Sequence, residues 1–192
     1  MPLGPTSDAA RIRLAAIEAI HERIDMNSTM IAPELFLQDT ILPVLEALDA
    51  ASPDSAAKLL LGTAIQESDL LYRRQLGGGP GRGLFQMEPA THDDIWNNYL
   101  RYRRNWASKV ESFLGSGTTN QVDELENNDR YAAAMARIHY MRRPEPLPDA
   151  GDLEAMAHYW KQHYNTALGQ GTVDQFIAKW KSRFPAIELG KG

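Results

Sequence analysis

The sequence contains no cysteine and no long apolar run, and its charge is not basic. Without cysteine the chain forms neither disulfides nor cysteine-based metal sites. The histidines are scattered and no HExxH motif occurs, so we expect no metal and no other cofactor. No stretch approaches the apolar length of a membrane span, which predicts no membrane insertion. A net charge of −5 disfavours general nucleic-acid binding.

Convincing strand patterns are also missing, because apolar and polar residues do not alternate over any long segment. Apolar residues recur instead at helical spacing, which predicts a mainly α fold. An irregular or β-like patch is expected only around residues 71–86. The expected helices cover residues 7–26, 33–50 with an interruption or a bend at Pro43, 53–67, 91–113, 128–142, 152–166 and 173–184. Their expected N-caps include Ser52, Thr91, Asp152 and Thr172.

Glu67 is the first candidate functional residue, because it ends an expected helix that is largely apolar. Ser52 followed by Pro53 is typical of the start of that helix. The negative end of the helix dipole and the apolar surroundings both raise the pKa of a carboxyl group. A carboxylic acid that is still protonated near neutral pH can protonate a leaving oxygen. From position alone, however, a solvated glutamate at a helix end is the commoner interpretation.

A glycine-rich loop follows Glu67. Residues 75–83, QLGGGPGRG, contain five glycines in nine residues, so they form neither a helix nor a regular strand and must turn sharply. Gly78 and Gly83 have the spacing of a phosphate-binding loop, but Leu84 and Phe85 stand where that motif needs Lys and Ser/Thr. This excludes nucleotide binding. The loop is either a tight turn or a segment whose backbone passes close to a substrate.

Residues 83–91, GLFQMEPAT, resemble the GLMQ-x-x-PAT motif of lytic transglycosylases and goose-type lysozymes. In that superfamily the catalytic glutamate belongs to a Glu-Ser pair about one loop upstream. Here Glu67 and Ser68 form such a pair, and Glu67 lies sixteen residues before Gly83. The resemblance covers roughly residues 52–183 and implies a lysozyme-like fold with Glu67 as the catalytic acid and base.

A looser match to the same superfamily lies near the C-terminus. Residues 163–166, HYNT, resemble the AYNAG segment, whose Tyr faces the catalytic Glu across the cleft. The resemblance implies four substrate-binding residues, which are Ser68, Gln86, Tyr164 and Asn165. A core tyrosine with a satisfied hydroxyl is an alternative interpretation of Tyr164, and Tyr159 is the alternative match.

The resemblance implies an enzyme that cleaves the β-1,4 bond between N-acetylmuramic acid and N-acetylglucosamine in peptidoglycan glycan strands. We expect a lytic transglycosylase, because no second carboxylate lies between Asp69 and Glu88. Hydrolysis by a lysozyme-like reaction is the alternative. The superfamily needs no cofactor for either reaction.

No secretory signal is recognised at the start, so we expect a phage or prophage protein that reaches the wall after holin-mediated release or within a virion. Two other functions fit the sequence. One is a virion component with a weakly active or inactive domain, for which other virion proteins are candidate partners. The other is a non-catalytic glycan-binding module.

We expect two parts in the chain. Residues 1–51 form an N-terminal helical extension packed on the core, and residues 52–192 form the lysozyme-like catalytic domain. The expected helix over residues 91–113 carries several aromatic residues, among them Trp96 and Tyr102. These could line a sugar cleft, but for most of them we prefer core packing.

Overall fold

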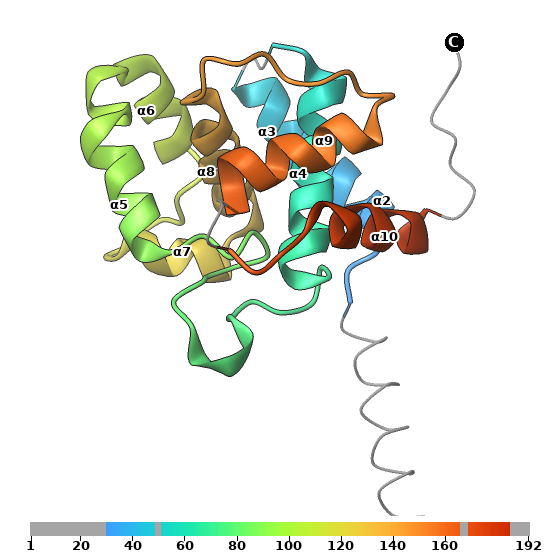
Figure 1. Cartoon of the computed structure of the whole chain (residues 1–192). Helices are drawn as coiled ribbons and strands as arrows, with labels where there is room; N and C mark the ends of the chain where they lie inside the picture. The colour runs from blue at the N-terminus through green and yellow to red at the C-terminus, as the bar shows by residue number, and fades with distance from the viewer. Residues whose placement is uncertain (1–29, 49–50, 166–168, 185–192) are drawn as a thin grey trace, which may run out of the picture. The chain divides into compact units, whose positions relative to one another are not determined.

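The computed structural model describes residues 30–48, 51–165 and 169–184 (Figure 1). Over these ranges the protein is mainly α, as predicted, and contains no regular strand. Isolated bridges pair Arg82 with Arg74 and with Met87, within or just beyond the region where a β-like patch was expected. The expected helix over residues 7–26 lies outside the described residues.

The helical elements follow one another from α2 to α10 (Figure 1). The first are α2 (Pro33–Phe36), the π-helical segment η1 (Leu37–Ile41), α3 (Leu42–Ala47) and α4 (Pro53–Ser68). Next come the 3₁₀ turn η2 (Leu76–Gly78), α5 (Pro89–Asn98), the 3₁₀ turn η3 (Leu100–Tyr102), α6 (Arg104–Glu111) and α7 (Gln121–Asn127). The last are α8 (Asp129–Met141), α9 (Leu153–Trp160), the π-helical segment η4 (Lys161–Asn165) and α10 (Val173–Arg183).

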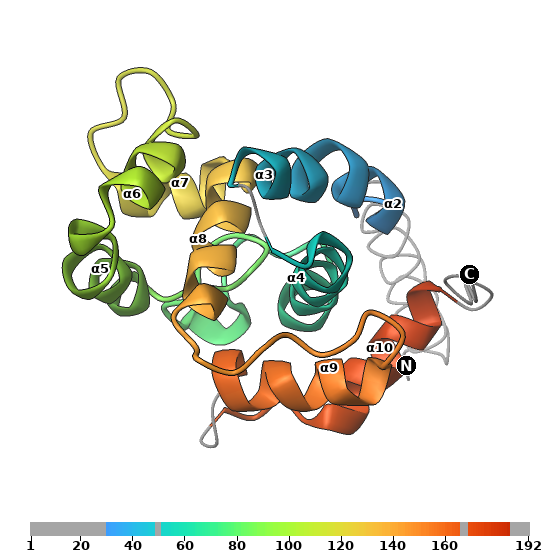
Figure 2. The ribbon, with the colours of Figure 1, turned by 90° about the horizontal axis from the view of Figure 1, so that it is seen from above.

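Helix α4 lies in the middle of the described helices and packs against α2, α3, α8, α9 and α10 (Figure 2). Eleven of its sixteen residues are buried, which explains why its sequence is apolar on most sides. Small residues allow close packing, since a Cβ on Gly62 would lie 2.3 Å from the Phe176 ring of α10. The Thr63 hydroxyl satisfies its hydrogen bonds internally, 2.7 Å from both the Leu59 carbonyl and the Tyr140 hydroxyl. Helix α4 is therefore a rigid support for the residues at its C-terminal end.

Pro43 is the second residue of α3, directly after the second expected helix changes from π-helical to α-helical geometry. Proline has no N–H, so the carbonyl of Asp39, four residues earlier, loses its helical partner. That carbonyl instead accepts hydrogen bonds from Arg130 Nε at 3.2 Å and Nη2 at 3.0 Å. The interruption thus ties this segment to α8. Residues 33–47 pack on α4 and α8 and belong to the compact unit that begins at Ala32.

The single helix expected over residues 91–113 is wrong. Helix α5 already begins at Pro89, with Glu88 rather than Thr91 at the N-cap. The chain leaves helical geometry at Tyr99 (φ −130°, ψ −61°) and again at Arg103 (φ −133°). Tertiary contacts favour this break, because the Tyr99 hydroxyl donates to the Met141 carbonyl at 3.1 Å. The guanidinium of Arg103 also lies 3.8 Å from the centre of the Tyr99 ring.

Two of the expected N-caps are confirmed. Asp152 accepts from the Ala155 N–H at 2.8 Å, and Thr172 forms the predicted capping box with Gln175 at the start of α10. Ser52 precedes Pro53 as expected, but it makes no capping hydrogen bond because its backbone is left-handed, with φ of 51°. Helix α7 was not predicted from the sequence, although Asn120 caps it through the Val122 N–H.

Candidate active site

A cavity of about 790 Å³ opens at the C-terminal end of α4. Its walls come from the end of α4, the glycine-rich loop around η2, the start of α5, the C-terminal end of α8, and η4 with the loop that follows. Four of the five predicted site residues line it, namely Glu67, Gln86, Tyr164 and Asn165. Its volume lies within the usual range for ligand pockets.

Glu67 is the penultimate residue of α4 and is mostly buried. Its Oε1 atom accepts a hydrogen bond from the Trp160 indole N–H at 2.9 Å. Burial raises the pKa of Glu67 to about 7, against the opposing effects of this hydrogen bond and of the ammonium groups of Lys179 and Lys161. Near neutral pH, Glu67 therefore exists in both protonation states. A carboxyl group of that kind can donate a proton in one step and accept one in the next.

Trp160 holds the Glu67 carboxyl in place, and the sequence analysis did not identify it. Its side chain is fully buried and its ring lies against Phe176, with ring centroids 5.4 Å apart. Gly171 approaches it so closely that a Cβ there would lie 2.7 Å from the indole. The indole is thus immobilised by packing. The sequence contained one indication that Trp160 lies near the site. It precedes Tyr164 by four residues, a spacing that places both side chains on one helical face.

The chain turns abruptly at the end of α4. Asp69 and Leu70 follow it with φ of 54° and 56°, a left-handed conformation that is unfavourable for residues other than glycine. Lys179 of α10 holds this turn, because its Nζ donates to the Gln66 carbonyl at 2.8 Å and to Asp69 Oδ2 at 3.0 Å. Gln86, on the same cavity, also has a positive φ of 47°. Backbone strain of this kind gathers at functional sites.

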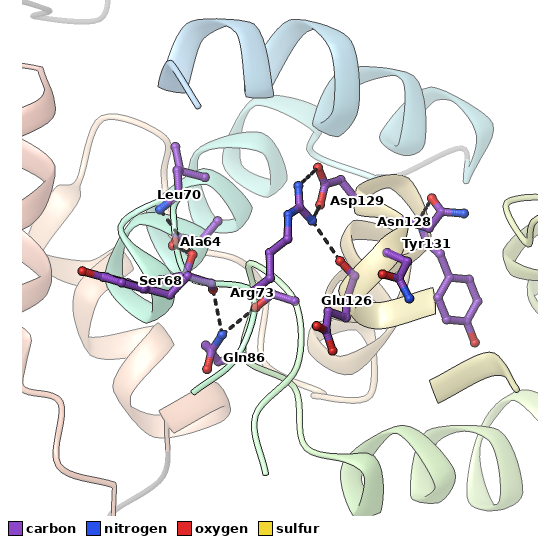
Figure 3. A network of polar contacts seen from close by, with 12 residues as sticks. Ala64, Ser68, Leu70, Arg73, Gln86, Glu126, Asn128, Asp129 and Tyr131 are labelled. Atoms are coloured by element: carbon purple, nitrogen blue, oxygen red, sulfur yellow. Dashed lines mark hydrogen bonds and ion pairs between the residues drawn. The ribbon is translucent and has the colours of Figure 1, made fainter. Parts of the chain in front are cut away.

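Ser68 does not line the cavity, contrary to its predicted role in substrate binding. Its side chain is buried, and its hydroxyl donates to the Ala64 carbonyl at 2.9 Å and accepts from the Leu70 N–H at 3.2 Å (Figure 3). Ser68 therefore closes the last turn of α4 and supports the left-handed residues that follow. Its hydroxyl proton is used within the protein, and its burial keeps the hydroxyl away from a ligand in the cavity.

Gln86 lines the cavity together with Glu67, as predicted. Its Nε2 atom donates to the Tyr72 carbonyl at 3.0 Å and to the Gly83 carbonyl at 2.7 Å (Figure 3). Its Oε1 atom packs over Gly81, where an added Cβ would approach within 2.9 Å. The glycine-rich loop thus folds around the Gln86 amide, and the hydrogen bonds of this amide hold the loop in place on the side that faces the cavity.

Tyr164 lies on the wall of the same cavity as Glu67, and its hydroxyl donates to the Phe85 carbonyl at 2.8 Å. Burial raises the pKa of Tyr164, and the charge of Glu67 raises it further, which indicates that the two side chains are near each other. The side chain that donates a hydrogen bond to the Glu67 carboxyl is Trp160. The alternative tyrosine, Tyr159, does not line the cavity and donates to the Glu145 carbonyl at 3.0 Å.

The aromatic residues of the expected helix over residues 91–113 do not form part of the cavity wall. Among them, Tyr102 is 70% exposed on another surface. The sequence analysis did not identify Gln66, His139 and Arg143, which do line it. The described part of the chain contains no cluster of His, Asp or Glu that could hold a metal ion. No described helix is long and apolar enough to cross a membrane.

Comparison of the chain with protein-family models, with curated proteins and with solved structures found no match.

Proposed function

We propose that the protein cleaves peptidoglycan glycan strands at the β-1,4 bond between N-acetylmuramic acid and N-acetylglucosamine, as a lytic transglycosylase. One observation carries this proposal: the carboxyl of Glu67 is mostly buried, has a pKa of about 7 and faces a cavity of about 790 Å³. The resemblance of residues 83–91 and of the Glu67-Ser68 pair to lytic transglycosylase motifs supplies the substrate class.

In the first step, protonated Glu67 donates its proton to the glycosidic oxygen while the bond from that oxygen to the muramyl C1 breaks. The Glu67 carboxylate that results faces the developing positive charge on the sugar and stabilises it. The Trp160 N–H stabilises the same carboxylate through its hydrogen bond to Oε1. It also prevents the carboxyl from rotating away from the bond that it must protonate.

In the second step, the 6-hydroxyl of the muramyl residue attacks C1, and the Glu67 carboxylate takes the hydroxyl proton. The product is a 1,6-anhydromuramyl end, and no water is consumed. Glu67 is then protonated again and ready for the next cycle. A single carboxyl group performs both steps because its pKa lies close to neutral pH.

The acidic residues of the cavity favour this reaction over two-carboxylate hydrolysis. Glycosidases that use two carboxyl groups place both across the scissile bond. Among the described residues that line the cavity, only Glu67 and Glu88 are acidic. Glu88 is exposed at the N-cap of α5, without the burial that Glu67 has. We therefore assign the nucleophile to the substrate.

The test is digestion of purified cell-wall sacculi, with the released muropeptides identified by mass spectrometry. The wild-type protein should release 1,6-anhydro muropeptides, and Glu67→Gln should release none. Products with reducing muramyl ends would show hydrolysis instead. If sacculi bind to the wild-type protein but are not cleaved, the domain is a glycan-binding or structural module and the proposed activity is wrong.

A further inference from the structure

One end of the cavity is built by two side chains, one from His139 near the C-terminal end of α8 and one from Arg143, two residues beyond that end. His139 and Arg143 are four residues apart, and both donate to the carbonyl of His163 in η4. The His139 Nε2 bond is the shorter, at 2.9 Å, and the Arg143 Nη2 bond is 3.2 Å long. Because His139 already satisfies this carbonyl, anchoring η4 does not by itself explain Arg143.

Arg143 has donors that the described part of the protein does not use. Its Nε atom is buried without a hydrogen-bond partner, and no carboxylate of the described residues lies within ion-pair distance of its guanidinium. Two other arginines differ in this respect, since Arg142 pairs with Asp94 and Arg73 pairs with Asp129 at 2.5 Å. An arginine is a strong donor to carboxylates, which it can bind through two parallel hydrogen bonds.

Arg143 also provides the positive charge of the cavity wall. Burial lowers the pKa of His139 to about 4, so this imidazole is neutral at physiological pH. Among the described lining residues, that leaves Arg143 as the one side chain that is cationic near neutral pH. The ligand group that suits this end of the cavity is therefore an anion with planar, paired oxygens.

We propose that Arg143 binds the lactyl carboxylate of a muramyl residue, an inference that rests on the proposed function. The two sugars of the glycan strand both carry an acetamido group at C2. Only the muramyl residue carries a lactyl ether at C3, where N-acetylglucosamine has a hydroxyl. On strands without stem peptides, Arg143 thereby decides which of the two alternating sugars occupies this end of the cavity, and so which glycosidic bond lies at Glu67. Strands whose stem peptides have been removed bind more tightly, because a stem converts the carboxylate into an uncharged amide.

The test is calorimetric binding in the Glu67→Gln background, so that the glycan is not consumed. Three tetrasaccharides are compared. The first alternates N-acetylglucosamine and muramic acid without stems, the second is the same strand with its lactyl carboxyl groups reduced to alcohols, and the third is chitotetraose. Without further substitution, the carboxylate strand should bind roughly 10- to 100-fold more tightly than the reduced strand, as expected for charge-assisted hydrogen bonds.

Arg143→Gln should remove this preference and leave the affinity for chitotetraose unchanged. Arg143→Lys should keep part of it, because lysine retains the charge but not the paired donors. Arg142→Gln is the matched control, because it removes the same charge from the residue next to Arg143 in the sequence. The Arg142 side chain pairs with Asp94 and does not line the cavity. The Arg142→Gln protein should retain the full preference.

Equal binding of the carboxylate and reduced strands before any change at Arg143 would overturn the inference. So would an Arg143→Gln protein whose affinity for chitotetraose falls as far as its affinity for the carboxylate strand, because a uniform loss indicates a purely structural role. Digestion of sacculi by the wild-type protein separates the two proposals. If muropeptides are released but Arg143 does not discriminate, only this inference fails. If the carboxylate strand binds through Arg143 but wild-type protein cleaves nothing, only the proposed chemistry fails.

Discussion

Replacement of Glu67 by glutamine should abolish cleavage and, at the same time, stabilise the protein at alkaline pH. The glutamine amide has nearly the same shape as the carboxyl and still offers an oxygen to the Trp160 N–H, 2.9 Å from Oε1 in the wild-type protein. It has no acidic proton to donate, so the first step of the reaction is lost. It also has no charge to bury, and this second property has a calculable effect on stability.

The size of the stabilisation follows from the pKa of Glu67, which burial raises from an ordinary value of 4.5 to about 7. Because the folded-state pKa is the higher one, the folded protein binds this proton more tightly than the unfolded chain does. Its contribution to stability is complete below about pH 4.5 and is lost as the pH rises to about 7. At about 1.4 kcal/mol for each pH unit between the two values, ionised Glu67 lowers the free energy of unfolding at pH 8 by roughly 3 kcal/mol.

Urea unfolding at pH 4 and at pH 8, followed by circular dichroism, measures this effect. Glu67→Gln should raise the free energy of unfolding by about 3 kcal/mol at pH 8 and change it little at pH 4. Glu88→Gln is the matched control, because Glu88 lines the same cavity but is exposed. It should keep cleavage and shift stability by no more than about 1 kcal/mol at either pH. A Glu67→Gln protein that is destabilised at pH 8, or that digests sacculi at the wild-type rate, would refute the reasoning.

Three further substitutions test the cavity wall and the side chain that holds Glu67. Trp160→Phe should shift the alkaline limb of the pH–activity profile to higher pH by about one pH unit or more, because the lost N–H holds the pKa of Glu67 down. An unchanged alkaline limb would argue against this hydrogen bond in the working enzyme. Tyr164→Phe should lower thermal stability by about 1 kcal/mol through the lost bond to the Phe85 carbonyl and also reduce turnover per folded molecule. If turnover is unaffected, Tyr164 is only a packing residue. Leu76→Ala should raise KM several-fold without changing the melting temperature, since this side chain lines the cavity and is 68% exposed; an unchanged KM would mean that it does not contact substrate.

Local chemistry was sufficient to predict much of the helical framework and the position of Glu67. Pro53 at a first helical position, the Asp152 cap and the Thr172 capping box each act within one turn of the chain, and each lies where it was predicted. The interruption of the helix next to Pro43, where π-helical η1 gives way to α3, follows in the same way from the missing N–H of proline. The apolar sequence before Glu67 predicted a buried helix and therefore a raised pKa for the carboxyl group, and burial is its main cause.

Only the tertiary structure decided which side chains meet at the cavity, because those contacts join residues that are remote in sequence. The Trp160 N–H and the Glu67 carboxylate are 93 residues apart, and no local pattern relates them. The Tyr164 hydroxyl likewise reaches a carbonyl 79 residues away, at Phe85. The resemblance implied that Ser68 binds substrate, but in a helix successive side chains point in different directions. Its hydroxyl therefore turns back into α4 while Glu67 faces the cavity.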